Sequence, residues 1–218
     1  MIAEKHESAG PLLSGASTEC VKQNGAMELP FSPAVSIPTP RLILRPFEPG
    51  DLEPLLAFHS DPASVRYVPF APRDRAGMES VLAQKISHTT LLAEGDRLEF
   101  AVVTSADPTV IGDVMLALRS VQNETVEVGY IFSPASTGHG YATETVRALL
   151  DLAFLQLRAR RVIARVDLRN GASRAVLERL GLRLEAELLE NEWFKGELTS
   201  EVDYAILARE WRGGPPEA

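Results

Sequence analysis

The segment from Val126 to Leu157 places a strand, a glycine-containing loop and a helix in direct succession. Apolar residues alternate from Val126 to Phe132, which is the period-2 pattern of a strand with one buried face. From Ala142 to Leu157 the apolar residues recur at helical spacing and form one face of a helix. This order places the loop between the end of the strand and the first turn of the helix.

The loop Ser136-Thr137-Gly138-His139-Gly140 has the composition of an anion-binding site. The first backbone N–H groups of a helix have no partner inside the helix, and they lie at the positive end of its dipole. Gly138 and Gly140 have no Cβ, so phosphate oxygens can approach the backbone closely. A plain strand-to-helix turn explains the two glycines equally well, because short Gly-x-Gly patterns are common.

Two common nucleotide-binding motifs do not fit this loop. A Walker loop ends in Gly-Lys-Ser/Thr, whereas this chain has Gly140-Tyr141-Ala142. A dinucleotide-binding fingerprint needs a third glycine where Thr143 stands, and it follows a continuously apolar strand. The loop therefore predicts a phosphate site of another kind.

Three separated segments resemble the GCN5-related N-acetyltransferases (GNAT family), and within them the RimJ/RimL-like branch that acetylates protein amino termini and other amines. They are TPRLILRPFEPGDL at 39–52, GYIFSPASTGHGYATE at 129–144 and LRNGASRAVLERLGL at 168–182. The resemblance implies an α/β fold: a mixed, mostly antiparallel sheet with helices on both faces. It also implies a V-shaped splay between two central parallel strands, here 126–132 and 161–167.

The resemblance further implies that acetyl-CoA binds in this splay. The family's loop motif is Arg/Gln-x-x-Gly-x-Gly/Ala, and alignment on the two glycines puts Ala135 at its first position. This departure removes one side-chain contact but leaves the backbone N–H donors, so affinity rather than the cofactor assignment is affected. The residues expected to contact the cofactor are Ile131, Phe132, Ser133, Thr137, Gly138, His139, Gly140, Tyr141, Ala142 and Asn170.

Amine acetylation requires a base, acting directly or through water, because a protonated amine is not a nucleophile. The departing thiolate requires an acid or a hydrogen-bond donor. The RimL-like pattern is Asn-x-x-Ser followed by a Glu nineteen residues after the Ser, which here are Asn170, Ser173 and Glu192. The resemblance implies that Glu192 is the general base and that Ser173 is the donor to the thiolate. Glu127 and water are the alternative bases.

The function implied is transfer of an acetyl group from acetyl-CoA to a primary amine by direct attack in a ternary complex. The acceptor is expected to be a protein N-terminal amine or a small cationic amine. A net charge of −8 favours a cationic partner and argues against a nucleic-acid surface. The alternative is a catalytically silent acyl-CoA-binding sensor or scaffold. Cys20 is the single cysteine and is not expected to carry an acetyl intermediate.

Residues 1–38 are rich in Ser, Gly, Pro and Glu without a period, so we expect a flexible extension before an acetyltransferase domain at 39–212. The single cysteine and the absence of a membrane-spanning apolar run predict a cytoplasmic protein with no membrane partner. No His, Cys and Asp cluster has metal-ligand spacing, so no metal is predicted. A monomer or a homodimer is expected.

Local patterns predict the remaining elements. Asn170 is expected to cap a helix that ends at Leu180-Gly181. Helical segments are predicted at 49–58, 61–67 and 75–93. Strands are predicted at 41–46, 98–104, 110–118, 182–189 and 202–208, with Glu192 in the connection between the last two.

Overall fold

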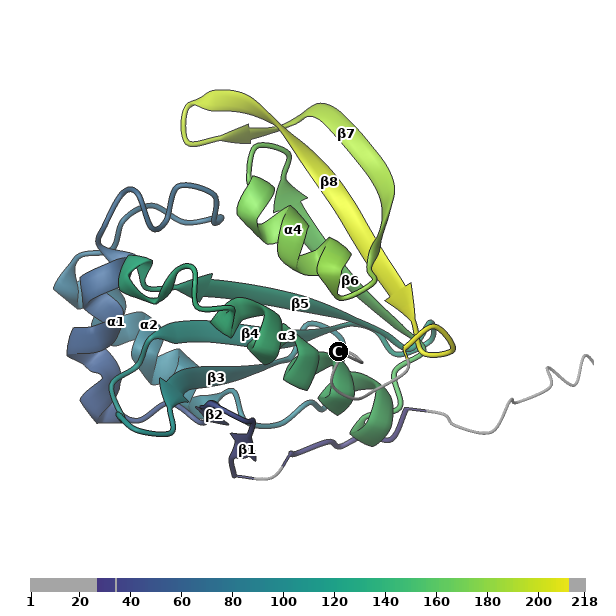
Figure 1. Cartoon of the computed structure of the whole chain (residues 1–218), viewed down its shortest axis with the longest axis horizontal. Helices are drawn as coiled ribbons and strands as arrows, with labels where there is room; N and C mark the ends of the chain where they lie inside the picture. The colour runs from purple at the N-terminus through teal and green to yellow at the C-terminus, as the bar shows by residue number, and fades with distance from the viewer. Residues whose placement is uncertain (1–26, 34, 212–218) are drawn as a thin grey trace, which may run out of the picture.

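A mixed sheet of eight strands runs through the described part of the chain (Figure 1). The computed structural model describes residues 27–33 and 35–211. The strand order is β1-β2-β3-β4-β5-β6-β8-β7, and every neighbouring pair is antiparallel except β5 and β6. This confirms the predicted mixed, mostly antiparallel sheet. The strands are β1 (Ile37–Pro38), β2 (Leu42–Arg45), β3 (Arg97–Thr104), β4 (Gly112–Ser120), β5 (Thr125–Phe132), β6 (Arg161–Asp167), β7 (Arg183–Phe194) and β8 (Glu197–Leu207).

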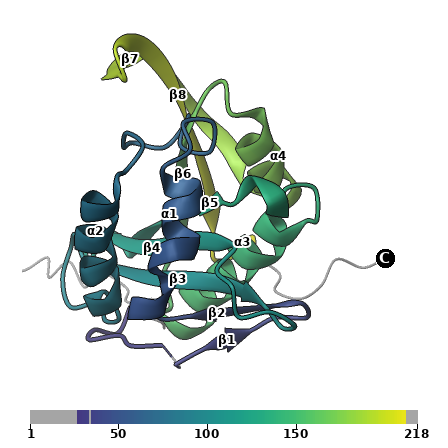
Figure 2. The same ribbon diagram turned by 90° about the vertical axis from the view of Figure 1, so that its left-hand side faces the viewer.

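Helices cover both faces of the sheet, as predicted (Figure 2). One face packs against α1 (Leu52–His59) and α2 (Arg75–Ser87), and the other against α3 (Tyr141–Asp151) and α4 (Gly171–Arg179). Successive side chains of a strand point to opposite faces, so β5 sends Val128 into the α3 core and Ile131 into the α1–α2 core. None of the helices in the described ranges is long and apolar enough to cross a membrane.

The two parallel strands separate after a short paired stretch. Their register pairs are Thr125↔Arg161, Val126↔Val162 and Glu127↔Ile163, and no pairing follows Glu127. Beyond this point β5 and β6 diverge, as Figure 1 shows. The predicted V-shaped splay is therefore present between the predicted strands, and it exposes backbone groups of β5 that a closed sheet would pair.

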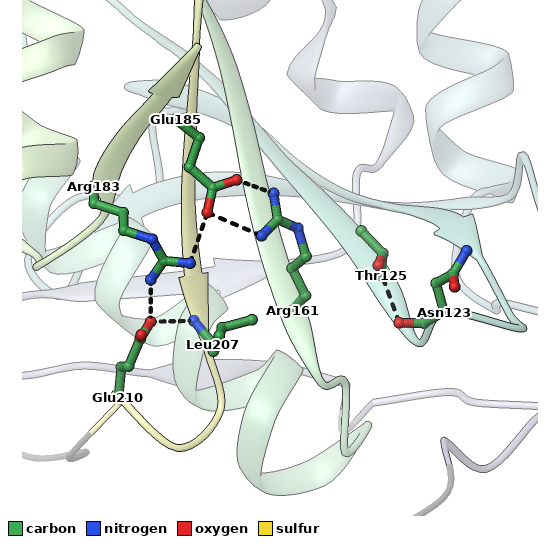
Figure 3. Close-up of polar contacts among 7 residues, drawn as sticks. All are labelled: Asn123, Thr125, Arg161, Arg183, Glu185, Leu207 and Glu210. Atoms are coloured by element: carbon green, nitrogen blue, oxygen red, sulfur yellow. Dashed lines mark hydrogen bonds and ion pairs between the residues drawn. The ribbon is translucent and has the colours of Figure 1, made fainter. Parts of the chain in front are cut away.

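An ion-pair network holds the strands together at the closed end of the splay (Figure 3). Arg161, the first residue of β6, donates from Nη1 to Glu185 Oε1 of β7 at 3.1 Å. Arg183 then links Glu185 to Glu210, with Nη2–Oε1 at 2.6 Å and Nη1–Oε2 at 2.5 Å. Glu210 Oε2 also accepts from the Leu207 backbone N–H at 2.9 Å. These contacts secure β6, β7 and β8 at the end where β5 and β6 still pair.

The segment between α1 and α2 differs from prediction. Residues 61–70 form turns instead of a short helical piece. Asp61 accepts hydrogen bonds from the Ala63 and Ser64 backbone N–H groups at 3.0 and 3.2 Å, which is an Asx-type turn that competes with a helix. The helix predicted at 75–93 ends at Ser87, and the chain then turns so that Leu91 can pair with Phe31.

The last two strands are longer than predicted. They meet at Lys195-Gly196, whose φ values of 50° and 87° suit a two-residue hairpin turn. Glu192 therefore lies in β7 and not in a loop. Cross-strand pairing with β8 imposes the extended conformation that the polar local sequence did not reveal.

Part of the predicted flexible extension packs on the domain. Phe31 and Leu91 exchange two backbone hydrogen bonds of 2.9 Å each, and β1 pairs with β2. Met27, Leu29, Phe31 and Ile37 lie against the α3 core, so these scattered apolar residues bury surface despite their polar surroundings. The ordered fold thus begins before the predicted boundary at residue 38. Residues 1–26, including Cys20, lie outside the described residues.

Candidate active site

Two cavities lie on opposite faces of the sheet and share wall residues at the splay. The larger, of about 1200 Å³, is on the α3 side and includes the glycine loop. The smaller, of about 450 Å³, is on the α1–α2 side. The residues that line both are Tyr67, Val68, Tyr130, Ile131, Asn170 and Ser173. Ligands held in the two cavities can therefore meet between β5 and β6.

The glycine loop presents an uncapped helix end to the larger cavity. Gly138 and Gly140 have φ values of 84° and 76°, in the left-handed region that favours glycine. Gly140 is the N-cap of α3 and provides no side-chain acceptor for the first turn. The N–H groups that begin at Tyr141 are thus available to an anion, and the helix dipole favours negative charge there.

Arg41 connects this loop to the start of the domain. Its Nη1 donates to the His139 carbonyl oxygen at 2.9 Å, and its Nε donates to Glu144 Oε2 at 2.7 Å. Burial alone would raise the pKa of Glu144, but hydrogen bonds from Thr39 and Arg41 outweigh it and lower the pKa. The carboxylate therefore stays ionised in the first turn of α3. The arginines that line the larger cavity are Arg41, Arg147 and Arg179.

Most residues expected to contact the cofactor are brought together here. Those that line the larger cavity are Ile131, Phe132, Thr137, Gly138, Gly140, Tyr141, Ala142 and Asn170. Ser133 and His139 lie beside it. The Ser133 N–H donates to the Ile111 carbonyl oxygen at 2.9 Å, and the exposed His139 ring stacks on Tyr141 with centroids 5.3 Å apart.

Ser173 lies where the two cavities meet. Asn170 Oδ1 accepts from the Ser173 backbone N–H at 3.1 Å, which confirms the predicted cap of α4. The Ser173 hydroxyl has no hydrogen-bond partner within the described ranges, so it is free to donate to a ligand. The predicted donor therefore stands beside both ligand spaces.

The two candidate bases differ in their ion pairing. Glu127 is buried, and its Oε2 lies 2.7 Å from Arg119 Nε and 3.3 Å from Arg165 Nη2. Glu192 follows a register shift in β7, is exposed, and forms no ion pair in the part of the chain that the structure describes. Both line the smaller cavity. A proton accepted by Glu127 would disturb two arginine contacts, whereas Glu192 has no such constraint.

Tyr130 is a site residue that the sequence reasoning missed. Its hydroxyl donates to the Ser173 carbonyl oxygen at 3.3 Å, and burial raises the pKa of Tyr130 to about 12. The phenol therefore keeps its proton at neutral pH and remains a donor. The only sequence signal was its position in the strand before the glycine loop, where alternation assigned it to the core.

A buried charged cluster forms the wall of the smaller cavity opposite the hairpin. Lys85 Nζ lies 2.5 Å from Glu99 Oε2 and 3.0 Å from Asp113 Oδ1. Burial would lower the pKa of Lys85, but the two carboxylates outweigh it and raise the pKa. Asp113 Oδ2 also lies 3.0 Å from His59 Nε2. Within the described residues, no group of three or more His, Cys, Asp or Glu is arranged to hold a metal ion.

Comparison with known proteins gives consistent matches. Residues 41–183 match the family model described as "Acetyltransferase (GNAT) domain". The chain is 30% identical over 175 residues to the uncharacterised N-acetyltransferase p20 of Bacillus licheniformis. This match covers 80% of this chain and 97% of that protein. It is also 32% identical over 107 residues to a Bacillus subtilis protein named "Putative ribosomal N-acetyltransferase YdaF". This match covers 49% of this chain and 58% of that protein.

A solved structure has the same fold. The crystal structure of a GNAT-family acetyltransferase from Bacillus anthracis superposes with a TM-score of 0.72 at 26% identity, covering 80% of this chain and 99% of that one. The family match includes the glycine loop, Asn170 and Ser173 and stops before Glu192.

Proposed function

Because this chain belongs to the GNAT acetyltransferase family, we propose that it transfers an acetyl group from acetyl-CoA to a primary amine by direct attack in a ternary complex. The chain is an N-acetyltransferase of GNAT type, a fold that uses an acyl-CoA donor. The main support for direct transfer in a ternary complex is that the two cavities share the wall residues Tyr130, Asn170 and Ser173. Two substrates bound on opposite faces of the sheet would meet without a covalent enzyme intermediate.

The larger cavity suits the coenzyme. Its glycine loop and the N-terminus of α3 offer backbone donors to phosphate oxygens, and Arg41 holds the loop in place through the His139 carbonyl oxygen. The unpaired backbone of β5 beyond Glu127 is available to the amides of the pantetheine arm. Bound acetyl-CoA would supply an activated thioester carbonyl.

The smaller cavity suits the amine. Glu192 accepts the amine proton, directly or through water, so that the nitrogen can attack the thioester carbonyl. The C–N bond forms as the C–S bond breaks. The Ser173 hydroxyl donates to the departing sulfur, and the Tyr130 hydroxyl, which donates to the Ser173 carbonyl oxygen, holds Ser173 at this junction. Glu127 and water are the alternative bases.

The acceptor is a protein N-terminal amine or a small cationic amine, and we place the chain in the RimJ/RimL-like branch. The likeness to YdaF supports this branch. An N-terminal amine has a reference pKa of about 7.7 to 8.0, against about 10.4 for lysine, so it is the easier group to deprotonate near neutral pH.

The test combines calorimetric titration with acetyl-CoA and a thiol-release assay over amino-terminal peptides, polyamines and small amines. We expect tight binding, turnover with at least one amine, and intersecting initial-rate lines. Parallel lines would contradict direct transfer. Binding without turnover on any amine would favour the alternative function, a catalytically silent acyl-CoA sensor or scaffold.

A further inference from the structure

We propose that the amine acceptor is a small amino-carboxylate, whose carboxylate is bound by Arg73 with a hydrogen bond from His59. This inference rests on the proposed acetyl transfer, because it takes the smaller cavity as the acceptor site, and it replaces the cationic acceptor proposed above by one that also carries a carboxylate. It follows from the charge distribution in that cavity: within the described part of the chain, one wall has carboxylates without an ion pair and another has a guanidinium without one.

Arg73 is held in place without an anionic partner among the described residues. Its backbone N–H donates to the His59 carbonyl oxygen at 3.0 Å, which closes the segment between α1 and α2. Its guanidinium lies 4.3 Å from the centroid of the Phe70 ring. No carboxylate in the described ranges forms an ion pair with it, and its Nε is buried without a hydrogen-bond partner. Because Arg73 lines the smaller cavity, an oxyanion bound there can accept from the terminal nitrogens of its guanidinium.

His59 supplies a second unsatisfied group on the same wall. Its side chain is only 1% exposed, and its ring stacks on Phe70 with centroids 5.2 Å apart and planes 5° apart. Nε2 lies 3.0 Å from Asp113 Oδ2, whereas Nδ1 has no hydrogen-bond partner among the described residues. A buried polar atom without a partner is costly, so a ligand or water is expected at this ring.

The other charges on this wall are already paired. Lys85 lies between Glu99 and Asp113, so it offers little free positive charge to a ligand. Arg97 has its Nη1 3.7 Å from Glu99 Oε1. Arg73 is therefore the cation on this wall that lacks a carboxylate among the described residues.

The wall of the smaller cavity that β7 and β8 form carries negative charge. Glu192 and Glu201 line the cavity, and neither forms a direct ion pair in the described chain. Burial raises the pKa of Glu201, and the nearby carboxylates of Asp203, Glu192 and Glu127 raise it further, against the effect of Arg165. A cationic group bound there would relieve this repulsion. The ammonium of the acceptor thus belongs on the hairpin side, close to Ser173.

The two walls belong to segments that approach each other. In Figure 1 the connection between α1 and α2 rises toward the β7–β8 hairpin, and Lys195 Nζ donates to the Val65 carbonyl oxygen between them. An acceptor with an ammonium at one end and a carboxylate at the other matches this polarity. A polyamine would place a second positive charge near Arg73, which is a repulsive contact.

The experiment measures kcat/KM in the thiol-release assay for ω-amino acids of increasing length, each compared with its carboxamide and with the diamine of equal length. The variants are Arg73→Gln and Arg73→Lys, with Arg66→Gln as the matched control. Arg66 lies in the same segment but is exposed and lines neither cavity. Thermal unfolding of each variant shows that it is folded.

We expect the best amino acid to exceed its carboxamide by about 10-fold to 150-fold in the wild type, the range of one charge-assisted contact of about 1.5 to 3 kcal/mol. Arg73→Gln should abolish this preference, mainly through KM. Arg73→Lys should keep part of it, and Arg66→Gln should keep all of it. A loss that is equal for all acceptors in Arg73→Gln would overturn the inference.

Equal rates for the acid, amide and diamine in the wild type would also overturn it, as would a preference for the diamine. A peptide with an acidic side chain that outperforms every amino acid would overturn the assignment to a small acceptor. In each of these cases acetyl transfer itself still occurs. The proposed function fails separately, if no acceptor releases thiol from acetyl-CoA.

Discussion

The Tyr130 hydroxyl donates to the Ser173 carbonyl oxygen at 3.3 Å and thereby links β5 to α4 across the open splay. This contact lies beyond the last paired residue of β5 and β6, Glu127. It fixes the start of α4, and with it the Ser173 hydroxyl, at the junction of the two cavities.

Glu192→Gln should lower turnover by about 10² to 10⁴, because the amide keeps the shape of the side chain but cannot accept the amine proton. Calorimetry should show little change in acetyl-CoA binding. Glu187→Gln, also exposed on β7 but outside both cavities, is the control and should behave as the wild type. If Glu192→Gln retains wild-type turnover and pH dependence, the base is Glu127 or water.

Ser173→Ala should reduce kcat with little effect on the KM of either substrate, because the lost hydroxyl acts on the departing sulfur. The cap of α4 should survive, since Asn170 bonds to the backbone N–H of this residue. Steady-state kinetics and thermal unfolding measure the two effects. A variant with unchanged kcat would assign the donor role elsewhere.

Tyr130→Phe removes the hydrogen bond that holds Ser173 beside both cavities, a contact that the structure added to the predicted site. Because the pKa of Tyr130 is raised to about 12, the phenol is protonated throughout the neutral range. Its removal should lower kcat without shifting the midpoints of the pH profile. A shifted midpoint would show instead that Tyr130 titrates during turnover.

Gly140→Val should raise the KM for acetyl-CoA much more than the KM for the amine. A Cβ at residue 140 would lie 3.6 Å from Arg41 Nη2, and a β-branched residue is strained at a φ of 76°, so the loop and its arginine contact would both be disturbed. Gly50→Val is the matched control, because Gly50 has open space around its Cβ position and no positive φ. Unchanged acetyl-CoA affinity in a folded Gly140→Val protein would contradict the phosphate site.

Lys85→Met should destabilise the fold by about 3 to 5 kcal/mol, because it leaves Glu99 and Asp113 buried without their cation. Arg75→Met removes an exposed pair with Glu53 and should cost at most about 1 kcal/mol. Chemical denaturation measures both free energies of unfolding. Equal losses would mean that the buried cluster adds nothing beyond a surface pair.

The same cluster predicts a pH dependence. Burial would raise the pKa of Asp113, but Lys85 and His59 outweigh it and lower the pKa below its ordinary value. Its contribution to stability is therefore present above the unfolded-state pKa of about 3.9 and is lost as pH falls through the lower folded value. Lys85→Met removes the cation that lowers the pKa of Asp113. The difference in free energy of unfolding between the wild type and Lys85→Met should therefore become smaller in acid.

The sequence alone was sufficient to locate the strand, glycine loop and helix around residue 140. Strand β6 lies at the predicted residues, and β5 begins one residue earlier than predicted. Asn170 caps α4 as expected. These features depend on neighbouring residues: alternation, glycine conformations and caps are all local, so the local sequence determines them.

Tertiary structure decided which side chains share the site. Tyr130 meets Ser173 only because β5 and β6 stop pairing after Glu127, and Glu192 reaches the smaller cavity only because β7 pairs irregularly with β8. The guanidinium of Arg73 stands over Phe70 in a segment whose turns the local pattern did not predict. Such contacts join residues far apart in the chain, and their energies depend on packing and long-range strand pairing, which no local pattern contains.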